Sequence, residues 1–307
     1  MNDAGDRQPS VYIGPAGWNY ADWKGIVFPP RMPAGLHPLT YLSQLFNTVE
    51  INSTFYRPAR PEYAARWAGC VENRPEFRFT AKLWRRFTHE RDSVPDTSEV
   101  QTVKNGLKPL VEAGTFGALL VQFPWSFRNS TDNRAWLDMV TERFAEYPIA
   151  VEVRHASWNV PEVYDYLHVK QVAICNIDQP MYRDSIAPDD KVTARFGYVR
   201  LHGRNHADWF RESAGRDERY NYLYSDQELG PWIENIRRMQ QLADAVYVIT
   251  NNHYRGQAVV NAFQIEHKLT GRKVDVPETL KTAYPALTSI AVESDRRQGT
   301  QMDLPGM

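Results

Sequence analysis

Eight short runs of β-branched or apolar residues recur along the chain at nearly even intervals, and this recurrence limits the fold more than any other feature. The runs cover residues 11–14, 48–51, 77–82, 118–123, 149–153, 172–177, 197–201 and 245–250. The first and the last begin 234 residues apart, so the mean interval is roughly 33 residues, which is the length of a β-α unit. Amphipathic helical patterns lie between the runs, for example at 134–147 and 230–243. The spacing predicts a single α/β domain, a (β/α)8 TIM-type barrel with parallel strands.

The alternative α/β fold, a doubly wound sheet, carries a glycine-rich phosphate turn after its first strand. This chain has GPAGW there, at residues 14–18, which is not that pattern. The 307 residues show no linker rich in Gly, Ser or Pro. We therefore expect one domain over residues 11–294, flexible tails at 1–10 and 295–307, and a long insert after strand seven.

Charge and hydropathy exclude several classes of protein. The 36 Lys and Arg against 37 Asp and Glu give a net charge of -1, whereas a broadly basic nucleic-acid binder carries a large positive charge. The two cysteines, Cys70 and Cys175, allow no disulfide framework and have no CxxC spacing for zinc. No apolar run is long enough to span a membrane, and the first ten residues lack the apolar stretch of a secretory signal. We expect a cytoplasmic protein without a membrane partner.

Polar side chains stand at the carboxyl end of nearly every predicted strand, which is where TIM barrels place their active sites. The same residue types, carboxylates, cations, amides and imidazoles, recur from strand to strand. In chain order these residues are Glu50, Asn52, Tyr56, Lys82, Gln122, Glu152, Arg154, Asp178, Arg200, His202, Asn251, Asn252 and His253.

Alternation along a strand places side chains two residues apart on one face, so that Glu152 and Arg154 point inward together, as do Arg200 and His202. A buried charge is costly when it is alone. The inward charges therefore either form a structural salt-bridge network or contact a ligand. As a set, they favour a site.

Single residues differ in what they indicate. His202 follows an apolar strand and precedes Gly203, so that its imidazole can reach the mouth where the chain turns; the lone histidines, such as His89, are more typical of loops. Asp178 fits a metal ligand, a general base or a turn residue equally well. Among the aromatics near strand one and in the insert (Trp209, Phe210, Tyr220, Tyr222 and Tyr224), most suit the packing of a lid, and Trp18 is expected to face a ligand because Gly14 and Gly17 flank it.

Seven motifs in fixed order resemble the YecE-like family, catalogued as domain of unknown function 72. They are GPAGWNYADWKGIVFPP, VEINSTFYRP, FTAKLWRRFTHE, VQFPWSF, AVEVRHASW, YVRLHGR, and NN followed by AVVNA. The resemblance spans about residues 11–270 and implies a TIM-type barrel of unsettled activity. Two departures are GPAGW, where threonine and serine more usually stand between the glycines, and Trp125, where a second proline is common.

The resemblance also implies which positions carry the family's signature. These include glycines and aromatics of the first loops as well as most of the strand-end residues. Mapped onto this sequence they are Gly14, Gly17, Trp18, Trp23, Glu50, Asn52, Phe55, Tyr56, Lys82, His89, Gln122, Glu152, Arg154, Trp158, Asp178, Arg200, His202, Gly203 and Asn252.

The first functional hypothesis is a hydrolase or lyase whose substrate carries a phosphate or another anion. In it Lys82, Arg154 and Arg200 hold the anion, Glu50 or Glu152 is the general base, and His202 is the acid. Other binding residues are expected among the remaining strand-end side chains. These are Trp18, Asn52, Tyr56, Gln122 and Asn252.

Two alternatives stay open. One adds a divalent metal held by Glu50, Glu152, Asp178 and His202, as in an endonuclease-like or isomerase-like barrel. In the main hypothesis no cofactor is expected, because Lys82 takes the electrostatic place of the metal. The other alternative is a non-catalytic protein that binds a nucleotide or single-stranded nucleic acid through aromatic stacking; the near-zero net charge disfavours it.

Overall fold

Eight parallel strands form one barrel in a computed structural model of the chain, which describes residues 10–207, 209, 211 and 216–293. The sheet order β1-β8-β7-β6-β5-β4-β3-β2 places sequence neighbours side by side all the way round. Every predicted run forms a strand, with bounds that shift by two residues at most. The strands are β1 (Ser10–Pro15), β2 (Thr48–Ile51), β3 (Arg78–Lys82), β4 (Phe116–Gln122), β5 (Ile149–Glu152), β6 (Ala173–Asp178), β7 (Phe196–Leu201) and β8 (Ala245–Thr250).

The barrel closes between β1 and β2 through a seam that is partly made by a side chain. The amide of Asn47 accepts from Ile13 N at 2.8 Å and donates to Val11 O at 2.7 Å, as a strand backbone would. Nearer the mouth, Gly17 N donates to Glu50 O. A Cβ on Gly14 would lie 1.9 Å from the Thr48 carbonyl oxygen, so only glycine allows the two strands to approach this closely.

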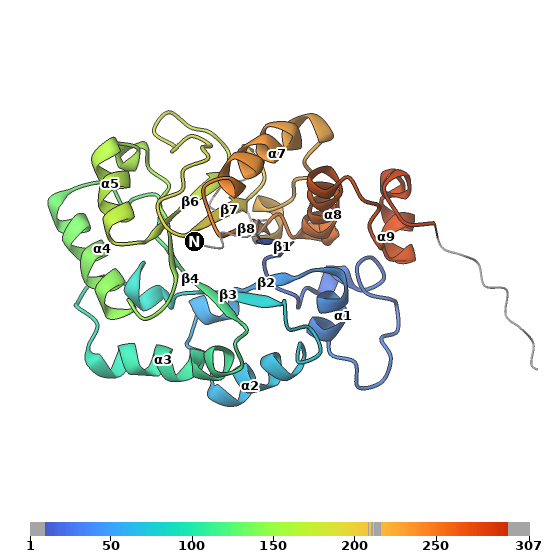
Figure 1. Cartoon of the computed structure of the whole chain (residues 1–307), viewed down its shortest axis with the longest axis horizontal. Coiled ribbons are helices and arrows are strands. Elements are labelled where there is room, and N and C mark those ends of the chain that lie inside the picture. Colours follow the sequence, from blue (N-terminus) through green and yellow to red (C-terminus); the bar gives the residue numbers. More distant parts are fainter. Residues whose placement is uncertain (1–9, 208, 210, 212–215, 294–307) are drawn as a thin grey trace, which may run out of the picture.

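Helices surround the barrel and cover the outer face of the strands (Figure 1). They are α1 (Pro38–Leu45), α2 (Pro61–Gly69), α3 (Thr97–Glu112), α4 (Thr131–Arg143), α5 (Pro161–Val169), α6 (Arg216–Arg219), α7 (Asp226–Gln240), α8 (Gln257–Thr270) and α9 (Glu278–Ala283). The segment between β6 and β7, residues 179–195, contains no helix. The alternation of strand and helix therefore holds for seven of the eight units.

Capping side chains set where the longer helices begin. Asp96 and Ser225 each accept from the backbone three residues on, and Glu99 and Glu228 bond back, which gives two capping boxes. Helix α3 consequently begins three residues before Val100, the first residue of its buried face. Apolar periodicity locates the buried face of a helix, whereas the capping residues determine where its first turn begins.

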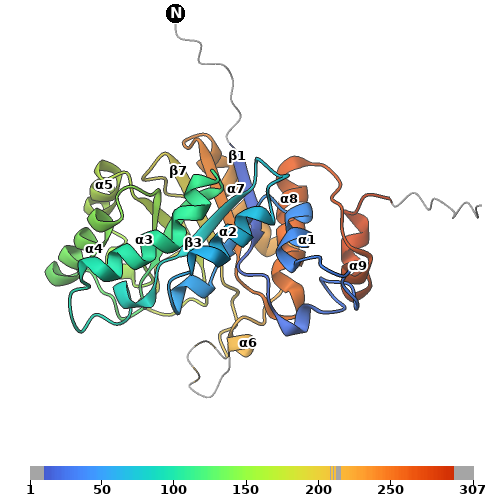
Figure 2. The same cartoon turned by 90° about the horizontal axis from the view of Figure 1, so that it is seen from below.

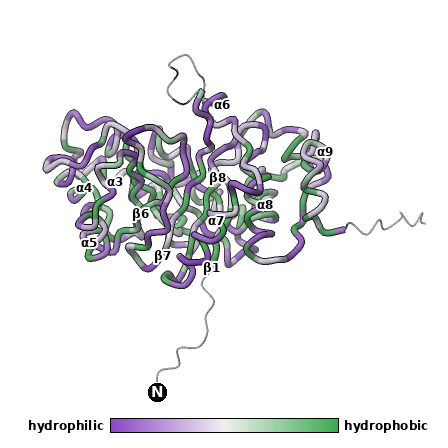
Figure 3. Tube along the Cα trace, turned by 90° about the horizontal axis from the view of Figure 1, so that it is seen from above, coloured by the Kyte–Doolittle hydropathy of each residue, from purple (hydrophilic) through white to green (hydrophobic). Residues whose placement is uncertain are grey.

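The insert after β7 carries α6 and projects beyond the body of the barrel, on the side opposite the start of β1 (Figure 2). Coloured by hydropathy, α6 is largely hydrophilic, while the strands and the inner faces of the surrounding helices contain the apolar residues (Figure 3). Since β1 begins at the far end, the insert stands at the carboxyl ends of the strands. It lies over the predicted mouth.

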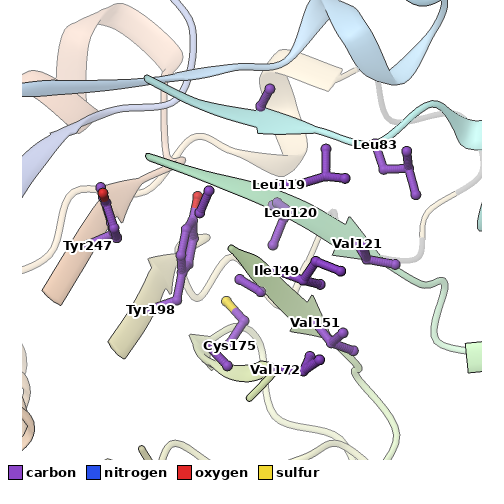
Figure 4. Packing of buried hydrophobic residues seen from close by; sticks show 14 of the residues in the cluster. Leu83, Leu119, Leu120, Val121, Ile149, Val151, Val172, Cys175, Tyr198 and Tyr247 are labelled. Carbon is purple, nitrogen blue, oxygen red and sulfur yellow. The ribbon is translucent and has the colours of Figure 1, made fainter. Parts of the chain in front are cut away.

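The core packs around the strands, as Figure 4 shows for the side between β3 and β8. Leu119, Leu120 and Val121 of β4 are buried beside Ile149 and Val151 of β5. Leu119 and Val121 face the surrounding helices, whereas Leu120 shares the inward face with Gln122. Both cysteines are free, which confirms that the chain uses no disulfide framework.

In the described residues, no helix is both long and apolar enough to cross a membrane. The tails expected at 1–10 and 295–307 fall outside the described part of the chain, except for Ser10, which is the first residue of β1.

Candidate functional site

A cavity of about 580 Å³ opens at the carboxyl ends of the strands. Loops after seven of the strands contribute to it, together with the insert. The residues that line it are Tyr20, Asn52, Phe55, Tyr56, Lys82, Arg85, His89, Gln122, Pro124, Trp125, Arg154, Gln179, Ser185, Arg200, Trp209, Arg219, Tyr220, Asn251 and His253. Five of these are lysine or arginine, and none of the described lining residues is Asp or Glu.

A buried ion-pair network forms the floor beneath this cavity. Arg200 reaches across the barrel, and its guanidinium donates to Glu50 Oε1 at 2.6 Å and to Glu152 Oε2 at 2.5 Å. All three side chains are almost completely buried. Each charge is therefore compensated within the protein, as a buried charge must be. The floor is therefore a structural salt-bridge network, which is one of the two alternatives that the sequence left open. The cavity lies above it.

Glu152 is held by three cationic or donor groups. Arg154 donates to Glu152 Oε1 through Nε and Nη2 at 2.9 and 2.8 Å, while His202 Nε2 lies 3.2 Å from the same oxygen. Burial alone would raise the pKa of Glu152, but Arg200, His202 and Arg154 hold it well below its usual value. Glu152 is thus a fixed carboxylate and a weak base.

His202 is neutral. Burial lowers its pKa to about 3, against the opposing effect of Glu152. The Asn251 amide nitrogen lies 2.9 Å from Nδ1, and because this nitrogen can only donate, the ring proton sits on Nε2, facing Glu152. A neutral imidazole buried in this way does not fit the role of general acid that the sequence predicts.

Strand β7 supplies the central column of the site. Tyr198, Arg200 and His202 follow one another at intervals of two, so that all three point into the barrel. At the lowest level, the Tyr198 hydroxyl lies 3.0 Å from Glu50 Oε2 and 2.8 Å from Thr80 Oγ1. Through these side chains, β7 is linked to β2, β3 and β5.

Lys82, at the end of β3, lines the cavity and differs from the floor residues in its partners. Its Nζ lies 3.8 Å from the centre of the Phe55 ring and makes no hydrogen bond or ion pair with any described residue. Burial, followed by the positive charge of Arg200, lowers the pKa of Lys82 to about 7. The neutral amine is therefore accessible near neutral pH.

Two further groups gather round the same Phe55 ring. The Arg85 guanidinium carbon lies 5.9 Å from its centre, and the His89 ring packs edge-on at 4.9 Å. Burial and the nearby charge of Lys82 lower the pKa of His89 to about 3. Burial is the larger cause of both shifts, and neighbouring cations act in the same direction.

Aromatic side chains form the opposite wall and the rim. Tyr20 stacks on His253 with ring centres 4.3 Å apart, and Tyr220 packs at 5.3 Å from the same imidazole. Trp209 of the insert lies 5.8 Å from Tyr220, and the Arg154 guanidinium carbon stands 5.5 Å from the Trp209 ring. The cavity thus combines cationic and aromatic side chains. Phe210, the other predicted insert aromatic, lies outside the described residues.

The structure brings most of the predicted site residues together. Glu50, Glu152 and His202 lie in the buried layer. Asn52, Tyr56, Lys82, Gln122, Arg154 and Arg200 line the cavity.

Two predicted binding residues lie elsewhere. Trp18 packs edge-on against Trp67 of α2, at 5.5 Å, and is not among the lining residues; Tyr20, two positions on, takes the place expected for it. The positive φ of Gly17, 81°, turns the chain directly before Trp18. Asn252 is buried and donates to Tyr222 O and Asn261 Oδ1. It supports the insert.

Asp178 has a structural environment. Arg204 donates to both of its oxygens, at 2.9 and 2.7 Å, while the Tyr224 hydroxyl and Trp232 Nε1 lie at 3.0 and 2.6 Å. With four donors, this carboxylate has no lone pair directed at the cavity. Across the described ranges no cluster of three or more His, Cys, Asp or Glu side chains could hold a metal ion. The four ligands of the metal alternative are therefore not assembled.

Sequence reasoning did not select several lining residues. Arg85 belongs to a basic pair that follows strand three, and this pair was the available signal. Tyr20, Trp125 and Arg219 stand on loops, where a pattern does not show which way a side chain points. His89 was set aside as a loop histidine, although the family resemblance includes it.

Comparison with known proteins identifies the family. The family model described as "Protein of unknown function DUF72" matches residues 12–285. The chain belongs to the DUF72 family. This confirms the resemblance drawn from the motifs.

Relatives of the DUF72 family match nearly their whole length. The UPF0759 protein YunF of Bacillus subtilis is 30% identical over 281 residues, which are 83% of this chain and 93% of YunF. The crystal structure of a DUF72 family protein from Thermotoga maritima has a TM-score of 0.74 and 32% identity, over 85% of this chain and 99% of that one. A second, from Enterococcus faecalis, has a TM-score of 0.75 and 25% identity, over 86% and 97%. Membership of the DUF72 family thus supports the barrel fold. The activity has to be inferred from the residues of the site.

Proposed function

We propose that this protein is an enzyme of the hydrolase or lyase class that acts on a small molecule bearing a phosphate or another anionic group. The observation that carries the proposal is the lining of the mouth, where Lys82, Arg85, Arg154, Arg200 and Arg219 meet without a described acidic residue. Carboxylates balance three of these charges: Glu50 and Glu152 in the floor pair with Arg200 and Arg154, and Glu90 pairs with Arg85. An anion in the cavity would find donors and positive potential on one side.

Lys82 is the proton-transfer group in this proposal, in place of the carboxylates. A general base works best when its pKa lies near the working pH. The pKa of Lys82, about 7, meets that condition, whereas Glu152 has a pKa well below its usual value. Arg85 and Arg154 would bind the anion, and Arg200 would orient the floor.

Calorimetric titration with phenyl phosphate tests the binding half of the proposal. Phenyl phosphate joins a dianion to a ring and so matches both sides of the cavity. We expect one saturable site, and Arg85→Gln should weaken it by roughly ten- to a hundredfold, because a hydrogen bond to a charged group contributes about 1.5–3 kcal/mol.

Arg237→Gln is the matched control. Arg237 forms an exposed ion pair with Glu234 on α7, away from the cavity, so this variant should bind as the unmodified protein does. An absence of saturable binding, or an equal effect of both substitutions, would reject an anion site in the mouth.

A further inference from the structure

We propose that Lys82 reacts covalently with its substrate and forms an imine with the carbonyl group of an anionic aldehyde or ketone. This inference rests on the proposed function and names its substrate class. It assigns Lys82 the role of nucleophile rather than that of a proton acceptor alone.

The first support is the isolation of the amine. Lysines that serve structure pair with carboxylates, as Lys104 does with Glu146 and Lys170 with Asp138. Lys82 Nζ contacts the Phe55 ring and has no hydrogen-bond or ion-pair partner among the described residues. Its lone pair, once the proton is lost, is not engaged by the protein and faces the cavity.

The second support is the protonation state. Only a neutral amine can attack a carbonyl carbon, and a buried lysine is the usual way to obtain one near neutral pH. The carboxylates closest to Lys82 are Glu50 and Glu152, and both are already bound by Arg200. They therefore do little to hold the proton on Lys82, which agrees with its pKa of about 7.

The third support is the arrangement of the anion donors around the amine. Arg85 shares the Phe55 ring with Lys82 and pairs with Glu90 through Nε, while Arg154, which pairs with Glu152, lines the same cavity. A substrate whose anion contacts these arginines would hold its carbonyl near Nζ. Binding of the anion would thus convert the reaction into an intramolecular one.

The step balances without a further reactant. Nζ adds to the carbonyl carbon, and the two amine protons leave with the carbonyl oxygen as water, so that a neutral carbon–nitrogen double bond remains. Once this imine takes up a proton, it withdraws electrons from the neighbouring carbon. The inference therefore selects the lyase branch of the proposed function.

Reductive trapping of the whole chain tests the inference, with pyridoxal 5′-phosphate as the probe and sodium borohydride as the reductant. The probe combines an aldehyde, a phosphate and a ring. We expect a reduced adduct on Lys82, identified by peptide mass mapping, at a probe concentration that leaves surface lysines largely unlabelled. The labelling rate should rise with pH and reach half of its plateau near pH 7, the pKa of the amine.

Three arms separate the explanations. Lys82→Arg should abolish this adduct while leaving the surface labelling unchanged, and excess phenyl phosphate should protect Lys82. Pyridoxal, which lacks the phosphate, should label Lys82 at least tenfold more slowly than its phosphate. Adducts spread over surface lysines, with Lys82 unlabelled in a protein that still binds phenyl phosphate, would overturn the imine and leave the proposed anion site standing. Loss of both labelling and phenyl phosphate binding would overturn both.

Discussion

At the scale of single residues, the mouth of the barrel separates charges by depth. Glu50 and Glu152 are buried against Arg200, whereas Lys82 stands one layer above them and has no ion-pair partner among the described residues. The lower layer stabilises the barrel because each charge is matched. The upper layer is left positive, which stabilises an anion instead.

Glu152→Gln should strongly destabilise the fold. Removing this charge leaves Arg154 and part of Arg200 uncompensated in a buried site, and breaking a buried pair in this way costs about 3–5 kcal/mol. Because the pKa of Glu152 lies below its usual value of 4.5, its contribution is present above about pH 4.5 and is lost as the pH falls further. Urea unfolding at pH 7 and below pH 4 measures both effects.

Glu234→Gln provides the comparison at an exposed Glu–Arg pair. Glu234 and Arg237 are both exposed, so the loss should stay within about 1 kcal/mol. If Glu152→Gln unfolds at the same urea concentration as Glu234→Gln, the floor is not a stabilising network.

At the scale of elements, the seam between β1 and β2 and the base of the insert shape the cavity. The seam depends on a glycine and on the Asn47 amide. The base of the insert depends on Asp178, which ties the start of the insert, at Arg204, to its end, at Tyr224. Neither the seam nor the base of the insert produces an apolar pattern in the sequence, so hydrophobic periodicity does not predict them.

Gly14→Ala should destabilise the barrel by about 1–3 kcal/mol or more, the range for overpacking, because its Cβ would meet the Thr48 carbonyl oxygen. Gly230→Ala is the control, since nothing lies within 4 Å of a Cβ at this position in α7. There, alanine should stabilise the helix by about 0.5–1 kcal/mol. Thermal unfolding of both variants checks the contrast, and equal melting temperatures would show that the seam is not tight.

Asp178→Asn should loosen the insert. An amide cannot replace the carboxylate that accepts from Arg204, Tyr224 and Trp232, so amide hydrogen exchange should accelerate over residues 216–224. Phenyl phosphate should also bind more weakly, since the insert supplies one wall. Asp244→Asn removes an exposed pair with Arg195 at the opposite end of the barrel and should change neither quantity. Unchanged exchange in both variants would contradict the anchoring role of Asp178.

At the scale of the whole molecule, the period of the strands was enough to predict the barrel, because every βα unit repeats the same packing problem. The strand ends also identified most of the polar layer, since alternation decides which side chains point inward. The pattern could not separate the buried floor from the open cavity. That distinction depends on how far Arg200 reaches and on which partners Glu50 and Glu152 find.

The orientation of loop side chains is the other feature that the sequence did not predict. Trp18 and Tyr20 are both aromatic residues of the same loop, yet Tyr20 lines the cavity and Trp18 packs against Trp67. Aspartate is a common catalytic residue, yet the carboxylate of Asp178 accepts hydrogen bonds from residues 26 to 54 positions away in the chain. Such contacts exist only once the barrel has closed.

The central claim is that the mouth binds an anion next to an amine that titrates near neutral pH. Its most direct test is the affinity for phenyl phosphate between pH 7 and pH 9, measured by calorimetry for the unmodified protein and for Lys82→Met. A bound dianion favours the charged amine, so the affinity of the unmodified protein should fall as the pH rises above about 7, by up to about tenfold per pH unit. Lys82→Met should bind with a nearly constant affinity. The same slope in both proteins, or no slope in either, would contradict the account.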